Sequence, residues 1–364
     1  MTGSSPPPGH VVAVDLGGTD IKAALVASDG SVTRTERRAT HRERGPQAVV
    51  DTVTDTAAAL AAESRASTGR PPLAVGVAVP GLVDTARGVA RYSANLGWHD
   101  LPLRAVLTQR LGLPVALGHD VRAGALAEGH LGAAQGHDDF LFVALGTGIA
   151  AAHVRNGQVW EGHRGAAGEL GHLTVRRGGA HCGCGRSGCL ETLASASAVA
   201  RRYTRAIGAD DREGAPSAAA VTAEEVCRRA GAGEPTARRI WDSAVASLAD
   251  GLAAYTVLCD PGTIVIGGGL ARAGAALMDP LRSRLAARLA FHRPPELVVA
   301  ALGSQAGCRG AALLALDLVD GGGLPAHPGE SVVYDRDPPA HPGESVVYDR
   351  DPPAHPGESV EAGP

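Results

Sequence analysis

Soft metal ligands are concentrated in one run of the chain, GHLTVRRGGAHCGCGRSGC, which ends at Cys189. Cys182, Cys184 and Cys189 offer three thiolates, and His172 adds an imidazole nitrogen. Three cysteines and one histidine form the closed ligand set that a structural Zn²⁺ prefers, whereas a disulfide would leave one thiol unpaired. His181 is a rival ligand, but a residue next to a metal ligand rarely folds back onto the same ion. The spacing therefore predicts a zinc site made by His172 and the three cysteines.

Two glutamates bracket this run. Glu169 lies three residues before His172, and Glu191 lies two residues after Cys189. Zinc does not require either of them. A rigidly held carboxylate can accept hydrogen bonds from two hydroxyl groups, so the pair suits a polyhydroxylated ligand. Solvated surface glutamates would have the same spacing, and both interpretations stay open on the residues alone.

The composition places the chain among soluble globular proteins with a large core. It has 364 residues, of which 44% are hydrophobic, and this length favours two domains. The net charge of −4 gives no reason to expect a nucleic-acid or membrane partner. No apolar run approaches the roughly 20 residues that cross a bilayer, and the N-terminus lacks the character of a signal peptide, so we expect a cytoplasmic protein. The three remaining cysteines, Cys227, Cys259 and Cys308, are expected to be small core residues.

A glycine-rich turn near the N-terminus is the first candidate for phosphate binding. The apolar run 11–14 leads into DLGGTDIK and then into a second apolar run at 23–26, which predicts two antiparallel strands joined by the turn. Backbone N–H groups of such a turn can bind an anion, and the aspartate before it can hold Mg²⁺ through water. An ordinary hairpin is the alternative. The residues predicted to bind the nucleotide here are Asp15, Gly17, Gly18, Thr19 and Lys22.

Two further glycine turns follow buried apolar strands. The strand predicted at 140–145 ends in Gly146, Thr147 and Gly148, and the next strand begins at Ile149. This strand–turn–strand pattern repeats the first one, which suggests two related α/β domains that face one nucleotide. The strand at 263–266 ends in a third turn, where the nucleoside end of the nucleotide is expected. The residues of that turn are Gly267, Gly268 and Gly269.

Between these turns the pattern predicts α/β units with loops at the carboxyl ends of strands, where such folds place ligands. A strand at 73–79 ends at Gly81, and a strand at 114–117 is followed by Asp120. Asp120 could cap a helix or act as a general base, and the two roles are compatible. Asn95, in an irregular loop expected at 92–98, is a candidate hydroxyl binder or a loop cap. Helices are expected at 46–65, 101–111, 192–207, 222–230 and 236–258.

The C-terminal segment differs in character from the rest of the chain. The sequence PAHPGESVVYDRDP occupies residues 325–338, repeats identically at 339–352 and begins again at 353. Proline and glycine at this density do not pack a core, so we expect a disordered tail over residues 321–364. We assign it no catalytic role.

Taken together, these motifs resemble the ROK family of sugar kinases and repressors, in particular its glucokinase-like, zinc-containing branch. The resemblance runs over residues 11–318 and is strongest in the ExGH and CxCGxxGCxE motifs that surround the cysteines. It implies an actin-like (ribonuclease H-like) α/β fold with ATP and the sugar between two domains. The implied boundaries are a flexible N-terminus over 1–9, a small domain over 10–120 with 306–320, and a large domain over 121–305.

The resemblance also implies an ATP-dependent kinase that phosphorylates a primary hydroxyl of a sugar, with Asp120 as the base. The cofactors implied are ATP, Mg²⁺ and Zn²⁺. A homodimer or homotetramer is expected. The repressors of the family carry an additional N-terminal DNA-binding domain, and only about ten residues precede the first strand here, which disfavours a transcription factor. The acceptor contacts implied by the resemblance are His119, Asp120, Glu169, His172 and Glu191, and the predicted acceptor site also includes Gly81 and Asn95 from the loops described above.

Two departures from the family pattern bear on the acceptor and the nucleotide. The family usually has asparagine where this chain has His119, and that asparagine contacts the sugar. The residues Ala150–Ala152 replace family glycines and could narrow the phosphate pocket. The first departure makes another hexose, an aminosugar or a C7-cyclitol of the valienone or valiolone type a candidate acceptor beside glucose. The competing hypothesis is a sugar-binding regulator of the same family with weak catalysis.

Overall fold

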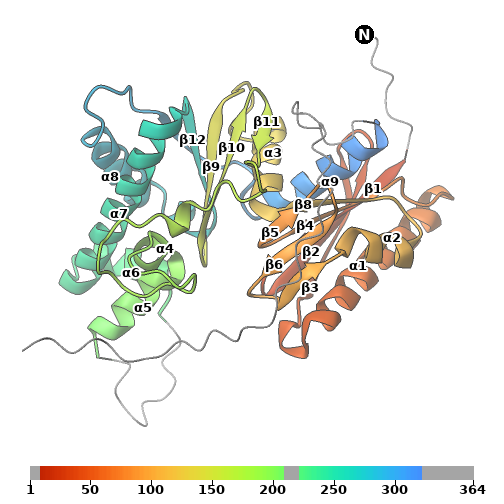
Figure 1. Ribbon diagram of the computed structural model, residues 1–364, viewed down its shortest axis with the longest axis horizontal. Coiled ribbons are helices and arrows are strands. Elements are labelled where there is room, and N and C mark those ends of the chain that lie inside the picture. Colours follow the sequence, from red (N-terminus) through yellow and green to blue (C-terminus); the bar gives the residue numbers. More distant parts are fainter. Residues whose placement is uncertain (1–8, 209–220, 322–364) are drawn as a thin grey trace, which may run out of the picture. The chain divides into compact units, whose positions relative to one another are not determined.

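The computed structural model describes residues 9–208 and 221–321, and within them it contains two five-stranded mixed sheets with helices packed on each (Figure 1). The repeats of 325–364 lie outside the described residues, so the expectation of a disordered tail stays a prediction. In the described part, no helix is both long enough and apolar enough to span a membrane.

The first sheet has the strand order β3-β2-β1-β4-β8. Its strands are β1 (His10–Leu16), β2 (Asp20–Ala27), β3 (Val32–Ala39), β4 (Val75–Val79) and β8 (Val115–His119). The antiparallel pair of β1 and β2 confirms the two strands predicted around the glycine turn. In addition, β3 pairs antiparallel with β2, and β4 and β8 run parallel to β1. Both β4 and β8 are buried along their whole length, which is the burial expected for parallel strands covered on both faces.

The second sheet repeats this plan with the order β11-β10-β9-β12-β13. Its strands are β9 (Phe140–Leu145), β10 (Ile149–Arg155), β11 (Gln158–Trp160), β12 (Thr263–Gly267) and β13 (Glu296–Val299). The hairpin of β9 and β10 is antiparallel, and β12 lies parallel to β9. Ala150–Ala152 lie within β10, as expected for residues that follow the turn. The two related α/β domains predicted from the paired hairpins are therefore present, although their boundaries stay a prediction.

The helices agree with the sequence pattern except near residue 195. Those of the first domain are α1 (Pro46–Thr68), α2 (Leu103–Leu111) and α9 (Ala306–Val319). Those of the second are α3 (Asp120–Leu131), α4 (Glu191–Ala194), α5 (Ala196–Ala206), α6 (Ala223–Gly231), α7 (Pro235–Cys259) and α8 (Ala275–Ala286). Short 3₁₀ turns lie along the chain at η1 (Arg42–Arg44), η2 (Leu170–His172), η3 (Gly269–Ala273) and η4 (Gly303–Gln305). The single helix expected at 192–207 is wrong, because Ser195 is extended and caps α5 through its hydroxyl.

The irregular loop expected at 92–98 is shorter in the structure, where residues 94–97 form a turn between two strands of a small antiparallel sheet. Its strands are β5 (Leu82–Asp84), β6 (Val89–Ser93) and β7 (Trp98–Leu101). Trp98 is 2% exposed and packs in the hydrophobic core of the first domain. Its indole N–H donates to the backbone oxygen of Pro46 at 3.2 Å. Burial of this ring, which a linear pattern does not reveal, orders the segment.

Helices α3 and α9 pack closely against each other. A Cβ atom at Gly310 would lie 1.9 Å from the backbone oxygen of Ala123, so only glycine allows this separation. Glu128 is fully buried, and its carboxylate accepts hydrogen bonds from the backbone N–H groups of Ala133, Ala301 and Leu302 at 2.8–3.0 Å. These contacts fix α3 relative to the segment that leads into α9.

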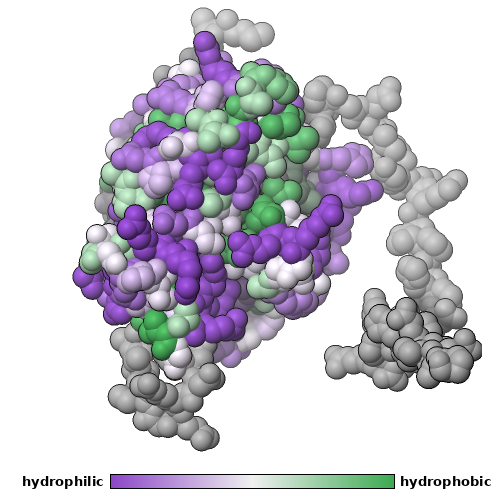
Figure 2. All heavy atoms as spheres, turned by 90° about the vertical axis from the view of Figure 1, so that its left-hand side faces the viewer, coloured by the Kyte–Doolittle hydropathy of each residue, from purple (hydrophilic) through white to green (hydrophobic). Residues whose placement is uncertain are grey.

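The surface on the side of α7 and α8 is mostly hydrophilic, with separate hydrophobic spots (Figure 2). The most exposed large apolar side chains of the described residues are Phe291 at 88% and Leu258 at 81%. Isolated apolar residues of this kind are normal on monomers. The predicted homodimer or homotetramer therefore stays a prediction.

Gly310→Ala should lower the free energy of unfolding by about 1–3 kcal/mol, because the new methyl group overlaps the α3 backbone. In an open helix the same change would stabilise by about 0.5–1 kcal/mol. Gly231→Ala is the matched control, since a Cβ there meets open space at the end of α6. Urea unfolding of the three proteins measures this, and equal midpoints for Gly310→Ala and the parent would contradict the close contact.

Candidate active site

Two aspartates predicted to do chemistry lie at the same edge of the first sheet. Asp15 near the end of β1 pairs with Ala78 of β4, and Ala78 pairs with Gly118 of β8. Asp120 follows β8 and is the first residue of α3, and its carboxylate accepts from the N–H of Val121 at 2.7 Å. Parallel pairing thus brings together two carboxylates that are separated by about a hundred residues in sequence.

Both carboxyl groups have raised pKa values. Desolvation by burial, and then the nearby Asp120, raise the pKa of Asp15 to about 6, although Lys22 opposes the shift. Desolvation also raises the pKa of Asp120 to about 6, against the hydrogen bond from Val121. The Asp120 side chain nevertheless keeps 30% of its surface accessible, so a ligand can reach it. A general base works best when its pKa lies near the working pH, and Asp120 meets this condition.

The first glycine turn has the geometry of a tight hairpin. The N–H of Gly17 donates to the backbone oxygen of Asp20 at 2.9 Å, and the hydroxyl of Thr40 donates to the oxygen of Gly17 at 2.8 Å. A Cβ at Gly18 would meet open space. Lys22 donates to the backbone oxygen of Ser304 at 3.0 Å and lies 3.8 Å from Asp15. Lys22 therefore lies beside Asp15, and its role in nucleotide binding stays a prediction.

His119 is buried next to Asp120 and has an unpaired nitrogen. Its Nε2 lies 3.4 Å from the Asp120 carboxylate, and its Nδ1 has no hydrogen-bond partner among the described residues. Desolvation, and then the nearby Arg122, lower the pKa of His119 to about 4, so the ring is neutral at physiological pH. A buried polar atom without a partner is costly, and a bound hydroxyl group would satisfy it.

The four predicted zinc ligands lie together. The donor atoms of His172, Cys182, Cys184 and Cys189 all lie within 4.8 Å of one another. The sulfurs of Cys184 and Cys189 are 3.7 Å apart, too far for a disulfide but close to the ~3.8 Å expected of two thiolates on a tetrahedral zinc with Zn–S bonds of ~2.3 Å. Burial and the neighbouring sulfurs raise the pKa of Cys189 to about 12, and a bound Zn²⁺ would oppose this shift, because metal binding favours the thiolate.

His172 turns its two ring nitrogens to different partners. Nδ1 lies 3.7 Å from the sulfur of Cys182, and Nε2 lies 3.9 Å from the carboxylate of Glu169. A carboxylate behind a metal-bound histidine is a common means of orienting the ring. His181 is exposed and is not part of the cluster, which agrees with the choice of His172 over it.

Glu191 contacts the second glycine turn. Its carboxylate accepts from the N–H of Ile149 at 3.0 Å, and a Cβ at Gly148 would lie 2.5 Å from the same oxygen. Because α4 begins directly after the cysteine run, this bond joins the metal-ligand segment to the hairpin of β9 and β10. One oxygen of Glu191 is therefore committed to the protein, and the other carboxylate oxygen is the one available to a ligand.

A cavity lies beside the second and third glycine turns. The N–H of Ala196 donates to Gly146, and the hydroxyl of Ser197 donates to Thr147 at 2.6 Å, so the start of α5 abuts the second turn. From there a cavity of about 340 Å³ extends to the third turn, within the size range of small-molecule sites. Its lining residues include Ala196, Thr222, Cys227, Trp241, Gly269 and Leu270.

Gly81 and Asn95 have unequal support. Val79 of β4 pairs with His119, and Gly81 follows two residues later with φ +103°, so it lies near the aspartates. A Cβ there would lie 2.2 Å from the backbone oxygen of Tyr92. Asn95 is exposed, and no contact ties its side chain to the other site residues.

Sequence reasoning missed three residues that connect the site. Arg122 is buried and contacts the backbone of residues 161–167, and Glu161 accepts from the hydroxyl of Thr85 at 2.9 Å. Spacing to Asp120 could have drawn attention to Arg122, because arginine in the first turn of a buried helix is unfavourable without a specific partner. The other two carry no signal in the linear sequence.

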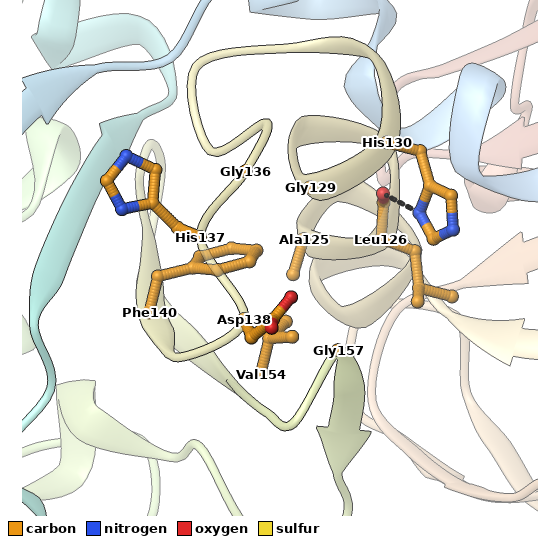
Figure 3. Close-up of a pocket in the computed structure, with 10 residues that line it drawn as sticks. All are labelled: Ala125, Leu126, Gly129, His130, Gly136, His137, Asp138, Phe140, Val154 and Gly157. Atoms are coloured by element: carbon orange, nitrogen blue, oxygen red, sulfur yellow. Dashed lines mark hydrogen bonds between the residues drawn. The ribbon is translucent and has the colours of Figure 1, made fainter.

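A second, smaller cavity of about 140 Å³ lies at the far end of α3 (Figure 3). Its walls come from α3, the loop before β9 and the hairpin of β10, and Asp138 points into it between Ala125 and Val154. None of its ten lining residues is among the predicted site residues. It is therefore separate from the candidate active site.

Known proteins resemble this chain in sequence and in fold over nearly their whole length. Residues 11–318 match the model of the ROK family. A glucokinase of Thermotoga maritima is 34% identical over 318 residues, which cover 85% of this chain and 98% of the relative. The crystal structure of a ROK hexokinase from Thermus thermophilus has 37% identity and a TM-score of 0.73, and it covers 86% of this chain and 99% of its own.

A third relative was solved with ligands. The ROK family glucokinase of Streptomyces griseus, in complex with glucose and AMPPNP, is 32% identical with a TM-score of 0.72, and the match covers 84% of this chain and 99% of that one. The family match, the paired α/β domains and the His/Cys₃ cluster all agree with the resemblance seen in the sequence. This chain is therefore a member of the ROK family, in its glucokinase-like branch.

Proposed function

We propose that the protein is an ATP-dependent kinase that phosphorylates the primary hydroxyl of glucose or of a glucose-like ring. The carrying observation is the pair Asp15 and Asp120 at one sheet edge, both with pKa values raised to about 6, where Asp15 leads into the first glycine turn. The similarity to glucokinases over nearly their whole length supports the same reaction class.

In the proposed reaction, Asp120 accepts the proton of the acceptor's primary hydroxyl as its oxygen bonds to the γ-phosphorus of ATP. The bond from that phosphorus to the bridging oxygen breaks, and ADP leaves with the electron pair. Asp15 and Lys22 face the transferred group, where Mg²⁺ supplies charge neutralisation when it is bound with ATP. The chain's own contribution is orientation, because phosphoryl transfer requires little covalent chemistry from the enzyme.

The nucleotide would extend over the three glycine turns. We place the phosphates at the first two, over Gly17, Gly18 and Thr19 and over Gly146, Thr147 and Gly148. The base would enter the cavity beside Trp241 and the third turn, Gly267–Gly269, because most of that lining is apolar and a purine ring buries a flat apolar surface. Ser195 and Ser197, next to the second turn, are polar groups within this path.

Zinc is proposed as a structural ion. His172, Cys182, Cys184 and Cys189 fit it in type and separation, and four protein ligands leave no open position for chemistry. The ion would stabilise the cysteine segment and orient His172, whose Nε2 faces Glu169. Glu169, His172, Glu191, Gly81 and Asn95 complete the proposed set of acceptor contacts.

His119 is the residue that bears on the acceptor's identity. Neutral histidine offers one hydrogen-bond donor and one acceptor. Asparagine also offers both kinds of group, but the histidine ring is larger and stiffer. Its unpaired Nδ1 is buried beside the base, so the preferred acceptor should pair with it. Sites that hydrogen-bond a hydroxyl group discriminate strongly against ligands that leave them unpaired. We therefore propose that a glucose-like ring other than glucose, such as another hexose, an aminosugar or a C7-cyclitol, is the preferred acceptor.

The acid limb of kcat/KM should have an apparent pKa near 6. Only the carboxylate form of Asp120 accepts a proton, and its pKa is raised above the ordinary value, so the rate should fall as the pH drops through about 6. Asp120→Asn should turn over about 10²–10⁴-fold more slowly, while acceptor binding persists. Its acid limb should move to lower pH, because only Asp15 then titrates, without the neighbouring Asp120 charge that raises its pKa. Initial rates between pH 5 and pH 8 measure it. An acid limb at the same pH in Asp120→Asn as in the parent would exclude Asp120 as the titrating base.

Cys184→Ser should lose both zinc and thermal stability, because a structural zinc contributes directly to folding. Cys259→Ser is the matched control, since Cys259 lies outside the cluster and outside the cavity proposed for the base. Metal analysis and thermal unfolding of the parent and both variants provide the test. Full activity in a metal-free protein would refute the structural role of zinc.

His119→Asn should raise kcat/KM for glucose relative to the preferred acceptor. The measurement is ADP release with a panel of hexoses, aminosugars and C7-cyclitols, for parent and variant under the same conditions. The expected result is a reversal or narrowing of preference between glucose and the best parent acceptor. If the parent already prefers glucose and the variant loses activity on every acceptor, His119 does not set acceptor choice.

A further inference from the structure

The segment Glu161–Gly168, which we call the strap, connects β11 to the acceptor residue Glu169 without forming a helix or strand. Gly162, Gly165 and Gly168 have φ values of 74°, 66° and 99°. Such a segment forms few backbone hydrogen bonds of its own, so its carbonyl groups need partners elsewhere.

Arg122 supplies those partners. Its Nη2 donates to the backbone oxygens of Gly165 at 2.7 Å, Ala167 at 3.2 Å and Glu161 at 3.4 Å. The side chain is 7% exposed, so these bonds form away from water. The planar guanidinium group of arginine can donate hydrogen bonds to several carbonyl groups at once. The ammonium group of lysine cannot reproduce this arrangement of donors.

Carboxylates balance the charge of this arginine. Glu161 lies 3.5 Å from Nη1, and its other oxygen accepts from Thr85 of the small sheet at 2.9 Å. Desolvation lowers the pKa of Arg122, while Glu161 and Glu169 oppose the shift, so Glu169 lies within electrostatic reach. Nη1 itself has no hydrogen-bond partner among the described residues.

The strap ends at a second fixed point. The backbone oxygen of Gly168 accepts from the N–H of Ala151 in β10 at 2.8 Å, and a Cβ at Gly168 would lie 2.0 Å from the Ala151 oxygen. Glu169 follows directly. The carboxylate of Glu169, which faces His172, is therefore held from two sides, by Arg122 through the strap and by β10 through Gly168, and loss of Arg122 leaves only the second of these.

We propose that Arg122 is a positioning residue that sets the place of Glu169, and so the acceptor affinity, by holding the strap. Arg122 lies two residues after Asp120 in the first turn of α3, so one helical turn carries both the base and the anchor of the acceptor loop. The inference rests on the proposed kinase function, because it assigns Arg122 to the acceptor side of that reaction.

The first test measures binding and turnover separately with D-glucose as the probe. Arg122→Met and Arg122→Lys, compared with the parent as zinc-loaded proteins, should raise both the calorimetric Kd and the KM for D-glucose about tenfold to hundredfold, the range expected for lost hydrogen bonds to a charged group. The KM for ATP should stay near the parent value. Arg282→Met is the matched control, because Arg282 also donates to a backbone oxygen, that of Leu297, but away from the site.

The second test is a double-mutant cycle with Glu169→Gln. If Arg122 acts through Glu169, the effects of Arg122→Lys and Glu169→Gln on D-glucose binding should be strongly non-additive. Additive effects, or an unchanged Kd for D-glucose in both Arg122 variants, would overturn the proposal. A parent that binds D-glucose but releases no ADP with any acceptor would instead refute the kinase function, and the binding cycle would still decide the role of Arg122.

Discussion

The parallel pairing of β1, β4 and β8 is the constraint on which the site depends. Backbone hydrogen bonds between these strands align Asp15, Ala78 and Gly118, so the chain segments that follow leave the sheet at one edge. All three strands are buried, which excludes water from their hydrogen bonds and makes a shift of register costly. This register, and not a direct bond, sets the distance between the two carboxylates.

Burial at this edge has an electrostatic consequence. Desolvation raises the pKa values of Asp15 and Asp120 to about 6 and lowers that of His119 to about 4. The buried groups Glu128 and Arg122 each find backbone partners, Glu128 three N–H groups and Arg122 three oxygens. The unpaired buried nitrogens of His119 and Arg122 occur beside Asp120, where an acceptor would be bound. Among the described residues, buried nitrogens of Arg104 and His153 also lack partners, so only those of His119 and Arg122 coincide with the proposed acceptor site.

Two segments hold the proposed acceptor residues in position, the strap before Glu169 and the cysteine segment after it. Arg122 and Thr85 hold the strap before Glu169, whereas the metal-ligand cluster holds His172 and, through α4, Glu191. Glu191 also bonds the turn of β9 and β10. The proposed acceptor residues are therefore connected to the helix of Asp120 on one side and to the proposed phosphate turn on the other, which suits a reaction that relies on positioning.

Local patterns in the sequence determined the elements whose signals are short in range. The paired strand–turn–strand motifs, the metal ligands and the aspartate after a buried strand all depend on residue type and spacing, and the structure agrees with them. Tertiary structure alone decided which distant groups meet. Arg122, Glu161 and Thr85 join through side chains from three separate elements, and Trp98 orders its hairpin by burial against Pro46. Such contacts depend on the packing of the whole chain, and no local pattern encodes them.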